Sequence, residues 1–392
     1  MRERWMKYFL MLMIIFVGTM CRKPYEPAAI KASNHFVAID GFINTTPNSS
    51  TTINLSRSLN LLDSATDLPE LGAQVSILSS DGGVYALIDT GADGNYVSAT
   101  LTLDPGLKYQ VSVTTIDGNK YLTDPVSSKT CQPIDSLNWE LVNDPAVGTD
   151  VVNIYVNTHD PSNNTRYYRW DYLETWQHNS VYETSWTLDE NGYETPIFST
   201  DVRYTHNCWT TAHSTSIILG TTITLSEDVV SSALVANFLK NDQKMDIEYS
   251  ILVRQYPLDA EAYKYWLTVQ KNSQSLGGLF DLQPSQINGN FHSITHPNDP
   301  ALGYISASSA QEKRIFISNR SLPGWQSNIG LSCQVDIVQS NPADPLLWNY
   351  PDTSKQLWYF VSGPPPLMKI ANKPCLDCRF QGGTNIKPSF WQ

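Results

Sequence analysis

The sequence predicts a mainly all-β protein, in which an N-terminal antiparallel β-sandwich is followed by a larger β-rich domain with about two short helices. Short segments that alternate apolar and polar residues recur along the chain, with Gly, Asp, Asn and Pro between them. The charged fraction is 16%, below the roughly 25% of typical domains, and Ser, Thr, Asn and Tyr fill the difference. A length of 392 residues is enough for two or more domains.

The N-terminus has the pattern of an export signal. Three basic residues precede an apolar run that ends at Met20, which is shorter than the roughly 20 residues needed to span a membrane. Cys21 follows directly, and this arrangement resembles the lipobox of bacterial lipoproteins, in which the cysteine is acylated. We therefore expect residues 1–20 to be a signal peptide and residues 21–34 a lipid-anchored tether to the membrane. An ordinary secretory signal and an uncleaved anchor are the alternatives.

Residues 35–130 carry the first β domain. Seven alternating segments follow one another here, and Asp-Gly pairs such as Asp81-Gly82 and Asp117-Gly118 mark turns between them. The stretch from Gly72 onward, GAQVSILSSDGGVYALIDTGADGNYVSATLTLDPGLKYQVSVTTIDGNKY, resembles the Ig-like or transthyretin-like modules of bacterial surface proteins. This resemblance implies an Ig-like β-sandwich and no particular activity.

Residues 131–392 remain rich in strand-like segments and are assigned to the larger β-rich domain. Two segments, near 226–240 and 259–273, have apolar residues at helical spacing. Ser226 and Asp259 precede them as candidate N-caps. We therefore expect a helix in each segment, covering a face of the β structure.

An aromatic segment, YYRWDYLETW, is a candidate binding surface. On a strand, alternate side chains point to the same face, which groups Tyr168, Trp170, Tyr172, Glu174 and Trp176. Aromatic rings offer flat apolar area to sugar rings or to a partner protein, and the acid could bind hydroxyl groups. The alternative is that the aromatic side chains fill a hydrophobic core.

No catalytic signature is present in the sequence. We find no H-E-x-x-H, G-x-S-x-G, Walker or dinucleotide-binding motif, and we predict no cofactor. The densest group of metal-ligating residue types is THNCWTTAH, which contains His206, Cys208 and His213. Zinc sites usually show paired C-x-x-C units, and the chain has only one such unit, so we regard this group as a weak candidate.

The cysteines suggest structural disulfides. If the first of the six cysteines is lipidated, five remain, and thiols tend to pair in an oxidising envelope. We expect Cys131, at the domain junction, to stay unpaired. The other four allow three pairings, of which we favour Cys208 with Cys333 and Cys375 with Cys378, because the C-x-x-C pair can close locally. The two alternatives join Cys208 and Cys333 to the two C-terminal cysteines in either order.

Six phrases follow one another along the chain: TTINLSRS (51–58), YYRWDYLETW (167–176), YSILVRQYPLDAEAYKYW (249–266), LFDLQPSQINGN (279–290), LGYISAS (302–308) and CLDCRFQGGTNIKPSFW (375–391). Together they resemble a family of Bacteroidota outer-membrane lipoproteins, "domain of unknown function 4249". The resemblance implies a lipid-anchored envelope protein, often encoded near TonB-dependent outer-membrane transporters, without established chemistry.

These observations lead to one expected function and one alternative. We expect a lipid-anchored outer-membrane protein with a non-enzymatic binding or scaffolding role, as an accessory to a TonB-dependent β-barrel transporter. The alternative is a surface glycan-binding protein that uses the aromatic residues of 167–176. A net charge of −12 without a basic cluster excludes a typical nucleic-acid-binding protein.

Overall fold

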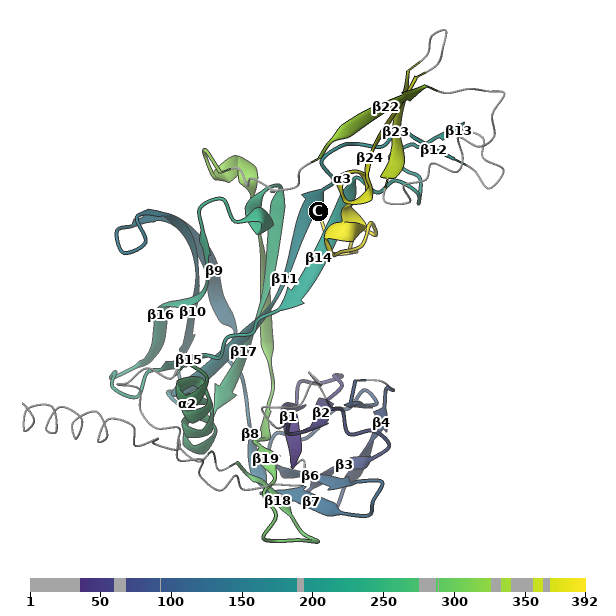
Figure 1. The fold of residues 1–392 in the computed structure, drawn as a ribbon. Helices are drawn as coiled ribbons and strands as arrows, with labels where there is room; N and C mark the ends of the chain where they lie inside the picture. The colour runs from purple at the N-terminus through teal and green to yellow at the C-terminus, as the bar shows by residue number, and fades with distance from the viewer. Residues whose placement is uncertain are drawn as a thin grey trace, which may run out of the picture.

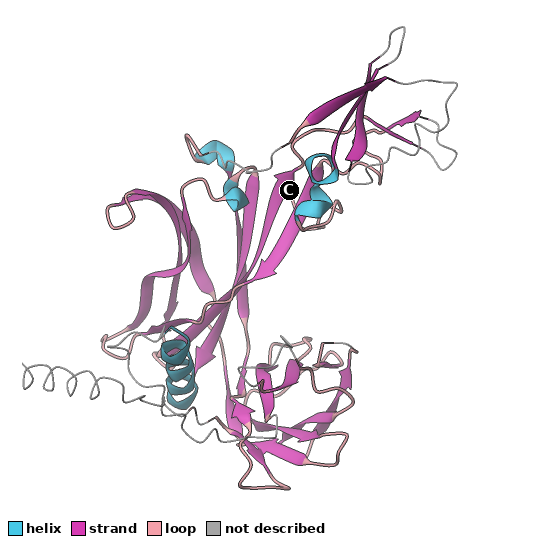
Figure 2. Ribbon diagram, in the orientation of Figure 1, coloured by secondary structure: helices cyan, strands magenta, loops and turns pink. Residues whose placement is uncertain are grey.

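Strands dominate the structure, which confirms the prediction of a mainly all-β protein (Figure 2). Residues 1–34, with the predicted signal peptide, tether and Cys21, lie outside the part described. None of the helices in the described part is long and apolar enough to cross a membrane. The computed structural model describes residues 36–59, 68–91, 93–188, 194–274, 287, 289–325, 333–339, 355–361 and 367–392.

The N-terminal strands form a closed, barrel-like sheet, here called the barrel. Its eight members follow the order β6-β3-β4-β5-β2-β1-β20-β8, and β8 pairs with β6 to close the ring. β7, β18 and β19 attach at its edges. The strands are β1 (Val37–Asn44), β2 (Thr52–Arg57), β3 (Gln74–Ser79), β4 (Val84–Asp89), β5 (Asn95–Ser98), β6 (Lys108–Thr114), β7 (Lys120–Thr123), β8 (Val126–Lys129), β18 (Phe291–Ser293), β19 (Leu302–Gly303) and β20 (Ser306–Ser308).

The barrel includes a segment that sequence analysis assigned to the second domain. β20 lies between β1 and β8 and runs parallel to both, with Ala307 opposite Ile43 on one side and Ser128 on the other. Ile43 and Ala307 are buried in the barrel core with alternate residues of the neighbouring strands. The predicted Ig-like or transthyretin-like sandwich is therefore not confirmed, because residues 35–130 alone do not complete their sheet.

Gly303, where β19 meets β1, must remain a glycine for these two strands to pair closely. Its φ is +121°, and an added Cβ would lie 2.0 Å from the carbonyl oxygen of Ile39. Gly303→Ala is expected to lower the free energy of unfolding by more than about 1–3 kcal/mol, the usual strain of an unfavourable backbone conformation, because a steric clash adds to that strain. Gly91→Ala is the matched control, since Gly91 has a φ of +117° and open space around it. Equal losses in urea denaturation would contradict the role given to the clash.

Two antiparallel sheets that pack face to face form the middle of the molecule, here called the body. Their facing residues share one core, in which Ile154 and Ile251 are fully buried. The first sheet has the order β16-β10-β9, and the second has the order β14-β11-β17-β21 with β15 beside β11. The strands are β9 (Ile134–Asp144), β10 (Thr149–Asp160), β11 (Tyr167–Asn179), β14 (Asn207–His213), β15 (Ile218–Thr221), β16 (Asp228–Leu239), β17 (Glu248–Leu258) and β21 (Gln311–Ser318).

The predicted helix at 226–240 is wrong, because this segment is strand β16. The register between β10 and β16 shifts twice, and Ser232 adopts a φ of +52° at the irregularity. Such bulges interrupt the two-residue alternation. As a result Val230, Val235 and Phe238 are buried five and three residues apart, so the strict alternation that identifies a strand is lost in this segment.

The second predicted helix is confirmed as α2 (Ala260–Gln274). Asp259 caps it, because its Oδ1 accepts a hydrogen bond of 2.7 Å from the backbone N–H of Ala262. In Figures 1 and 2 this helix lies between the barrel and the body.

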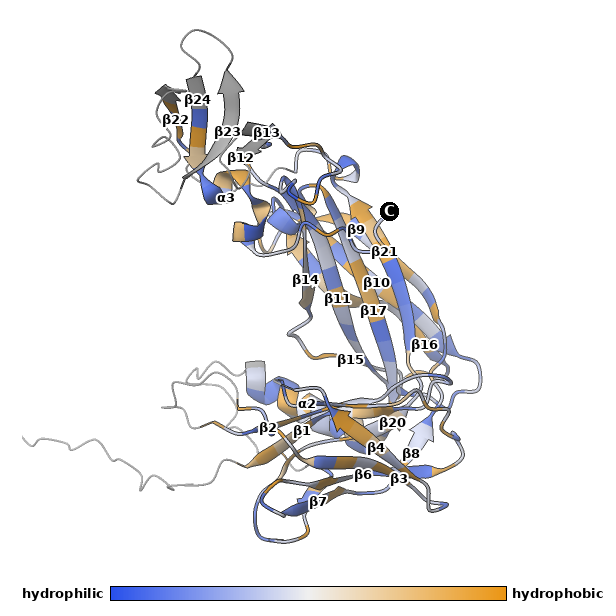
Figure 3. Cartoon of the chain, turned by 90° about the vertical axis from the view of Figure 1, so that its right-hand side faces the viewer, coloured by the Kyte–Doolittle hydropathy of each residue, from blue (hydrophilic) through white to orange (hydrophobic). Residues whose placement is uncertain are grey.

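The C-terminal unit lies at the end of the body opposite the barrel (Figure 1). In this unit β24 is the central strand of a small sheet, and β12 pairs with β13. Figure 3 shows the same succession of barrel, body and C-terminal unit from the side, with hydrophilic and hydrophobic residues mixed along the long strands of the body. The remaining elements are β12 (Trp186–Leu188), β13 (Glu194–Pro196), β22 (Val335–Gln339), β23 (Lys355–Val361), β24 (Leu367–Asn372), α3 (Lys373–Leu376), and the 3-10 turns η1 (Gln243–Met245), η2 (Asn319–Ser321) and η4 (Cys378–Gln381).

Candidate functional site

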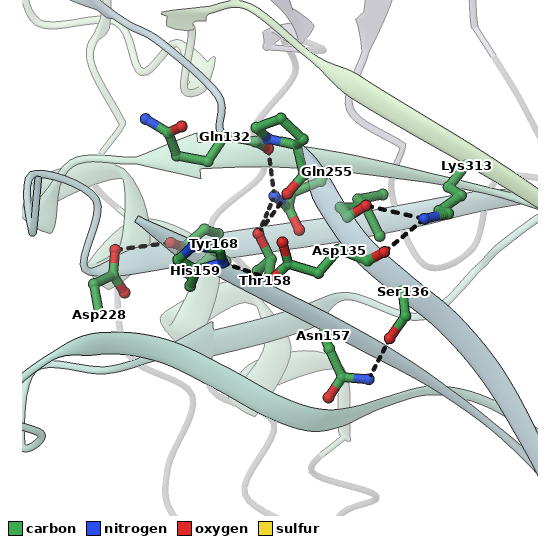
Figure 4. Close-up of polar contacts among 12 residues, drawn as sticks. Gln132, Asp135, Ser136, Asn157, Thr158, His159, Tyr168, Asp228, Gln255 and Lys313 are labelled. Carbon is green, nitrogen blue, oxygen red and sulfur yellow. Dashed lines mark hydrogen bonds and ion pairs between the residues drawn. The ribbon is translucent and has the colours of Figure 1, made fainter. Parts of the chain in front are cut away.

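The junction between barrel and body is fixed by a buried glutamine. Gln255 on β17 is fully buried, and its Nε2 donates to the backbone oxygen of Gln132 at 3.0 Å and to Thr158 Oγ1 at 3.1 Å (Figure 4). Its Oε1 accepts a hydrogen bond of 2.9 Å from Trp170 Nε1. The segment that leaves the barrel is therefore bonded to the core of the body, with the polar atoms of the glutamine side chain satisfied.

Cys131 lies at this junction as an unpaired, buried thiol, as expected from the sequence. Its Sγ donates to the backbone oxygen of Gln255 at 3.2 Å. Burial raises the pKa of the Cys131 thiol to about 12. The group therefore stays protonated at neutral pH and has the character of a structural rather than a nucleophilic cysteine.

A large cavity lined by described residues lies beside α2 at this junction. It has a volume of about 670 Å³ and is lined by the barrel edge, by α2 and by the segment that returns to the barrel. Asp124 and Lys129 come from the barrel, Glu261 comes from α2, and the rings of Tyr265 and Tyr304 lie with centroids 5.3 Å apart. Mixed charges and aromatic rings give this cavity the character of a site for a polar ligand.

The smaller cavity, of about 300 Å³, lies between β1 of the barrel and the outer face of the body. Arg169 contributes its guanidinium group, which stacks over the ring of Trp266 at 3.8 Å from the ring centroid. Arg254 Nε donates to Asp171 Oδ1 at 2.8 Å in the same wall. The sequence analysis did not single out these residues. The signal that could have identified them is the alternation of charged and aromatic residues in YYRWDY, which puts the charges on the face opposite the aromatic rings.

The four aromatic residues of β11 that were predicted to form a binding surface belong to the core of the body. The exposed fractions are 0% for Tyr168 and 1% for Trp170, and Tyr172 and Trp176 pack against the same core. The Tyr168 hydroxyl donates to Asp228 Oδ2 at 2.8 Å, so its polar end is satisfied inside the protein (Figure 4). The shared face predicted from the sequence is correct, but it faces inward.

Glu174, the acid of the predicted surface, has a structural role in the core. Its Oε1 accepts a hydrogen bond of 2.7 Å from Lys244 Nζ, and its Oε2 accepts one of 3.0 Å from the Tyr249 hydroxyl. The Lys244 ammonium group also lies 5.1 Å from the ring centroid of Trp176. Because the charge of the carboxylate is compensated within the protein, Glu174 is not available to a ligand.

The weak metal candidate is not supported by the geometry. Cys208 is oxidised in a disulfide and offers no thiolate. His206 precedes β14 and His213 ends it, which separates them by about 20 Å at the rise of a strand. Among the described residues, no three His, Cys, Asp or Glu side chains are grouped so that they could hold a metal ion.

The disulfide pairing favoured from the sequence is wrong, and one of the two long-range alternatives is present. Cys208 is bonded to Cys378, and Cys333 is bonded to Cys375. The two C-terminal cysteines are held against different segments, because the carbonyl oxygen of Cys375 accepts from the N–H of Tyr182 whereas the N–H of Cys378 donates to Thr205. Because Cys375 and Cys378 are bonded to different segments, they do not form the local C-x-x-C bridge.

The last residues of the chain, which follow the Cys208–Cys378 disulfide, return to the edge of the body. Trp209 and Thr384 exchange two backbone hydrogen bonds, of 2.8 and 3.0 Å. The ring of Trp391 lies 6.4 Å from that of Trp209 and 5.5 Å from that of Phe316. His178 Nε2 donates to the carbonyl oxygen of Gly382 at 3.2 Å. The C-terminal tail is thus held by a disulfide, by backbone pairing and by aromatic contacts.

One buried histidine, His178, and one half-buried histidine, His206, make the stability of this region sensitive to pH. Burial lowers the pKa of His178 and of His206 below the ordinary value. The unfolded chain therefore binds more protons than the folded chain between the folded pKa and about 6.5, and stability falls as the pH decreases through this window. We expect the free energy of unfolding to drop between about pH 7 and pH 5, and to drop less in a His178→Gln, His206→Gln double variant. Equal pH dependence in urea denaturation of both proteins would contradict this assignment.

Comparison with known proteins identifies the family. No curated protein matches the chain. The family model for "Domain of unknown function (DUF4249)" matches residues 22–314, which is more than half of the sequence. This range includes the barrel with its returning strands, both junction cavities and the body as far as Arg314 in β21. The chain belongs to the family of domain of unknown function 4249.

Proposed function

We propose that this chain is a lipid-anchored cell-envelope protein with a non-enzymatic binding role, an accessory to a TonB-dependent outer-membrane transporter. Acylation of Cys21 would hold it at the outer membrane through residues 21–34. The lipobox-like pattern and the family resemblance stated above support this proposal. The two disulfides also support it, because cysteines are oxidised in this way in the envelope and not in the cytosol.

The observation that carries the proposal is that the predicted lipid anchor and an exposed apolar surface lie at opposite ends of the molecule. The barrel begins at Val37, directly after the predicted tether, and the disulfide-held C-terminal tail lies at the far end of the body (Figure 1). Large apolar side chains remain exposed around this tail. Their exposed fractions are 66% for Phe198, 87% for Val202, 58% for Phe380 and 73% for Ile386.

Two of these side chains, Val202 and Ile386, belong to segments that are hydrogen-bonded to each other. The Nδ2 atom of Asn385 donates to the backbone oxygen of Val202 at 2.9 Å and to that of Tyr204 at 3.2 Å, which places Ile386 beside the Val202 loop. Exposed apolar groups that cluster in this way are typical of surfaces that bind another protein. We therefore place the transporter contact at this end of the chain.

The test is a pull-down of the tagged full-length protein from detergent-solubilised outer membranes. We expect it to recover an outer-membrane β-barrel protein, and we expect a Val202→Ser, Ile386→Ser variant to recover much less. The matched control is Val84→Ser, Ile88→Ser, which changes two barrel residues that are 66% and 71% exposed. Failure of the wild type to recover any β-barrel protein would refute the accessory role. Equal recovery by both variants would refute the location of the contact.

The glycan-binding alternative is not proposed further. It depended on the aromatic residues of 167–176, and Tyr168 and Trp170 are buried in the core.

A further inference from the structure

Arg169 presents unused hydrogen-bond donors to the smaller junction cavity. Its guanidinium lies 3.8 Å from the ring centroid of Trp266 and 5.8 Å from that of Tyr256. Stacking of this kind occupies the flat face of a guanidinium and leaves its in-plane N–H groups available. Within the described part of the chain, the guanidinium makes no hydrogen bond or ion pair. The stacked rings therefore hold the cation in place while its donors remain open.

Asp40 presents the opposite charge to the same cavity from the barrel side. Its carboxylate makes no hydrogen bond or ion pair with any described residue, and so it is not paired with Arg169. The other charged pair in the wall is already neutralised, because Arg254 binds Asp171 at 2.8 Å. Among the described residues, one guanidinium and one carboxylate that line this cavity, from two different units of the fold, thus make no hydrogen bond or ion pair.

Tyr265 shows that the two charges lie near each other. Burial raises the pKa of the Tyr265 hydroxyl, the negative charge of Asp40 raises it further, and the positive charge of Arg169 lowers it. Both charges therefore act on the hydroxyl of Tyr265, which lies on α2. The geometric basis is that Asp40 and Arg169 both line the same cavity of about 300 Å³, in which they do not bond to each other.

We propose that the smaller junction cavity binds a small zwitterion, an α-amino acid or a dipeptide. Arg169 would bind the carboxylate through paired N–H donors, which match the two oxygens of a carboxylate, and Asp40 would bind the ammonium group. The volume of about 300 Å³ suits a ligand of this size, because it is at the low end of the range for small-molecule sites. The exposed Thr215 and Ser216 of the β14–β15 connection line the opening and offer hydroxyl groups to the rest of the ligand. This site is independent of the transporter contact proposed above, which lies at the other end of the body.

The test is calorimetric titration of the full-length protein with L-alanyl-L-alanine and with its two singly capped forms. We expect saturable binding of the dipeptide. We expect affinity to fall about tenfold or more when the carboxylate is amidated or when the amine is acetylated, because each cap removes one charge-assisted contact.

Variants assign each contact to its residue. Arg169→Gln is expected to weaken dipeptide binding and to abolish the preference for the free carboxylate. Asp40→Asn, at an exposed position, is expected to abolish the preference for the free amine and to leave the fold intact. Arg320→Gln and Asp299→Asn are the matched controls, since both residues are exposed and lie outside the cavity, and we expect them to bind as the wild type does.

The outcomes separate this proposal from a structural role of the arginine. If Arg169→Gln lowers the thermal stability, two other variants keep the test decisive. Arg169→Lys retains the positive charge, and Asp40→Asn changes a side chain that does not stack on an aromatic ring. Absence of dipeptide binding at about 1 mM, equal binding of the capped forms, or unchanged selectivity in Asp40→Asn would overturn the proposal. None of these results depends on whether a transporter is recovered in the pull-down.

Discussion

Replacement of Trp170 by alanine is expected to lower the free energy of unfolding by about 3–5 kcal/mol, as for other large buried aromatic side chains. The ring is 1% exposed, lies 5.6 Å from the ring of Tyr168, and donates from Nε1 to Gln255. It also fits against Gly220 so closely that a Cβ on that residue would lie 2.6 Å from the ring. The substitution would therefore leave a large cavity and an unpaired glutamine oxygen in the core of the body.

The measurement is urea denaturation followed by far-ultraviolet circular dichroism. Phe198→Ala is the control, because Phe198 is 66% exposed and its loss is expected to change stability by no more than about 0.5 kcal/mol. If Trp170→Ala were as stable as this control, the ring could not be part of the core, and the binding-surface interpretation of the aromatic segment would return.

Removal of the Cys208–Cys378 disulfide, by changing both residues to alanine, is expected to have a comparable effect. The bridge closes a sequence separation of 170 residues, for which chain entropy gives about 5 kcal/mol. We expect hydrogen exchange to accelerate at Trp209, Thr384 and Trp391, because the tail loses its covalent attachment. The barrel amides of Val111 and Val113, which are fully buried, are expected to stay protected.

The Cys333–Cys375 disulfide, here called the inner disulfide, supplies the comparison for this experiment. Cys333 and Cys375 are separated by 42 residues, for which the same relation gives about 4 kcal/mol. Their double alanine variant is expected to lose less stability and to keep the tail amides protected, because Cys208–Cys378 remains closed. Faster exchange of the tail in this variant alone would show that the inner bridge holds the tail.

Local patterns were enough to predict the fold class and α2, but not the tertiary pairings. The Asp259 cap and the helical spacing after it are local properties, so α2 could be read directly from the sequence. β16 could not be read in this way, because its bulge at Ser232 replaces strand alternation by a helix-like spacing. Barrel closure by residues 291–308 depends on hydrogen bonds to strands far away in sequence, which no local pattern specifies.

The candidate site shows the same limit at the level of single side chains. Alternation along β11 correctly grouped Tyr168, Trp170 and Glu174 on one face, and the same alternation leaves Arg169 and Asp171 on the other face. The alternation does not predict which face of β11 is buried, because burial depends on how the two sheets of the body and the barrel pack against each other. The pairing of Cys375 and Cys378 with different partners likewise depends on the segments that each one contacts.

We propose that this protein is acylated and disulfide-bonded and resides in the cell envelope. The decisive experiment is mass spectrometry of the native protein, purified from membranes and digested without reduction. We expect an N-terminal peptide that begins at Cys21 and carries acyl chains, together with peptides joined through Cys208–Cys378 and Cys333–Cys375. An unmodified Cys21 within a chain that retains residues 1–20, with the other cysteines recovered as free thiols, would contradict it.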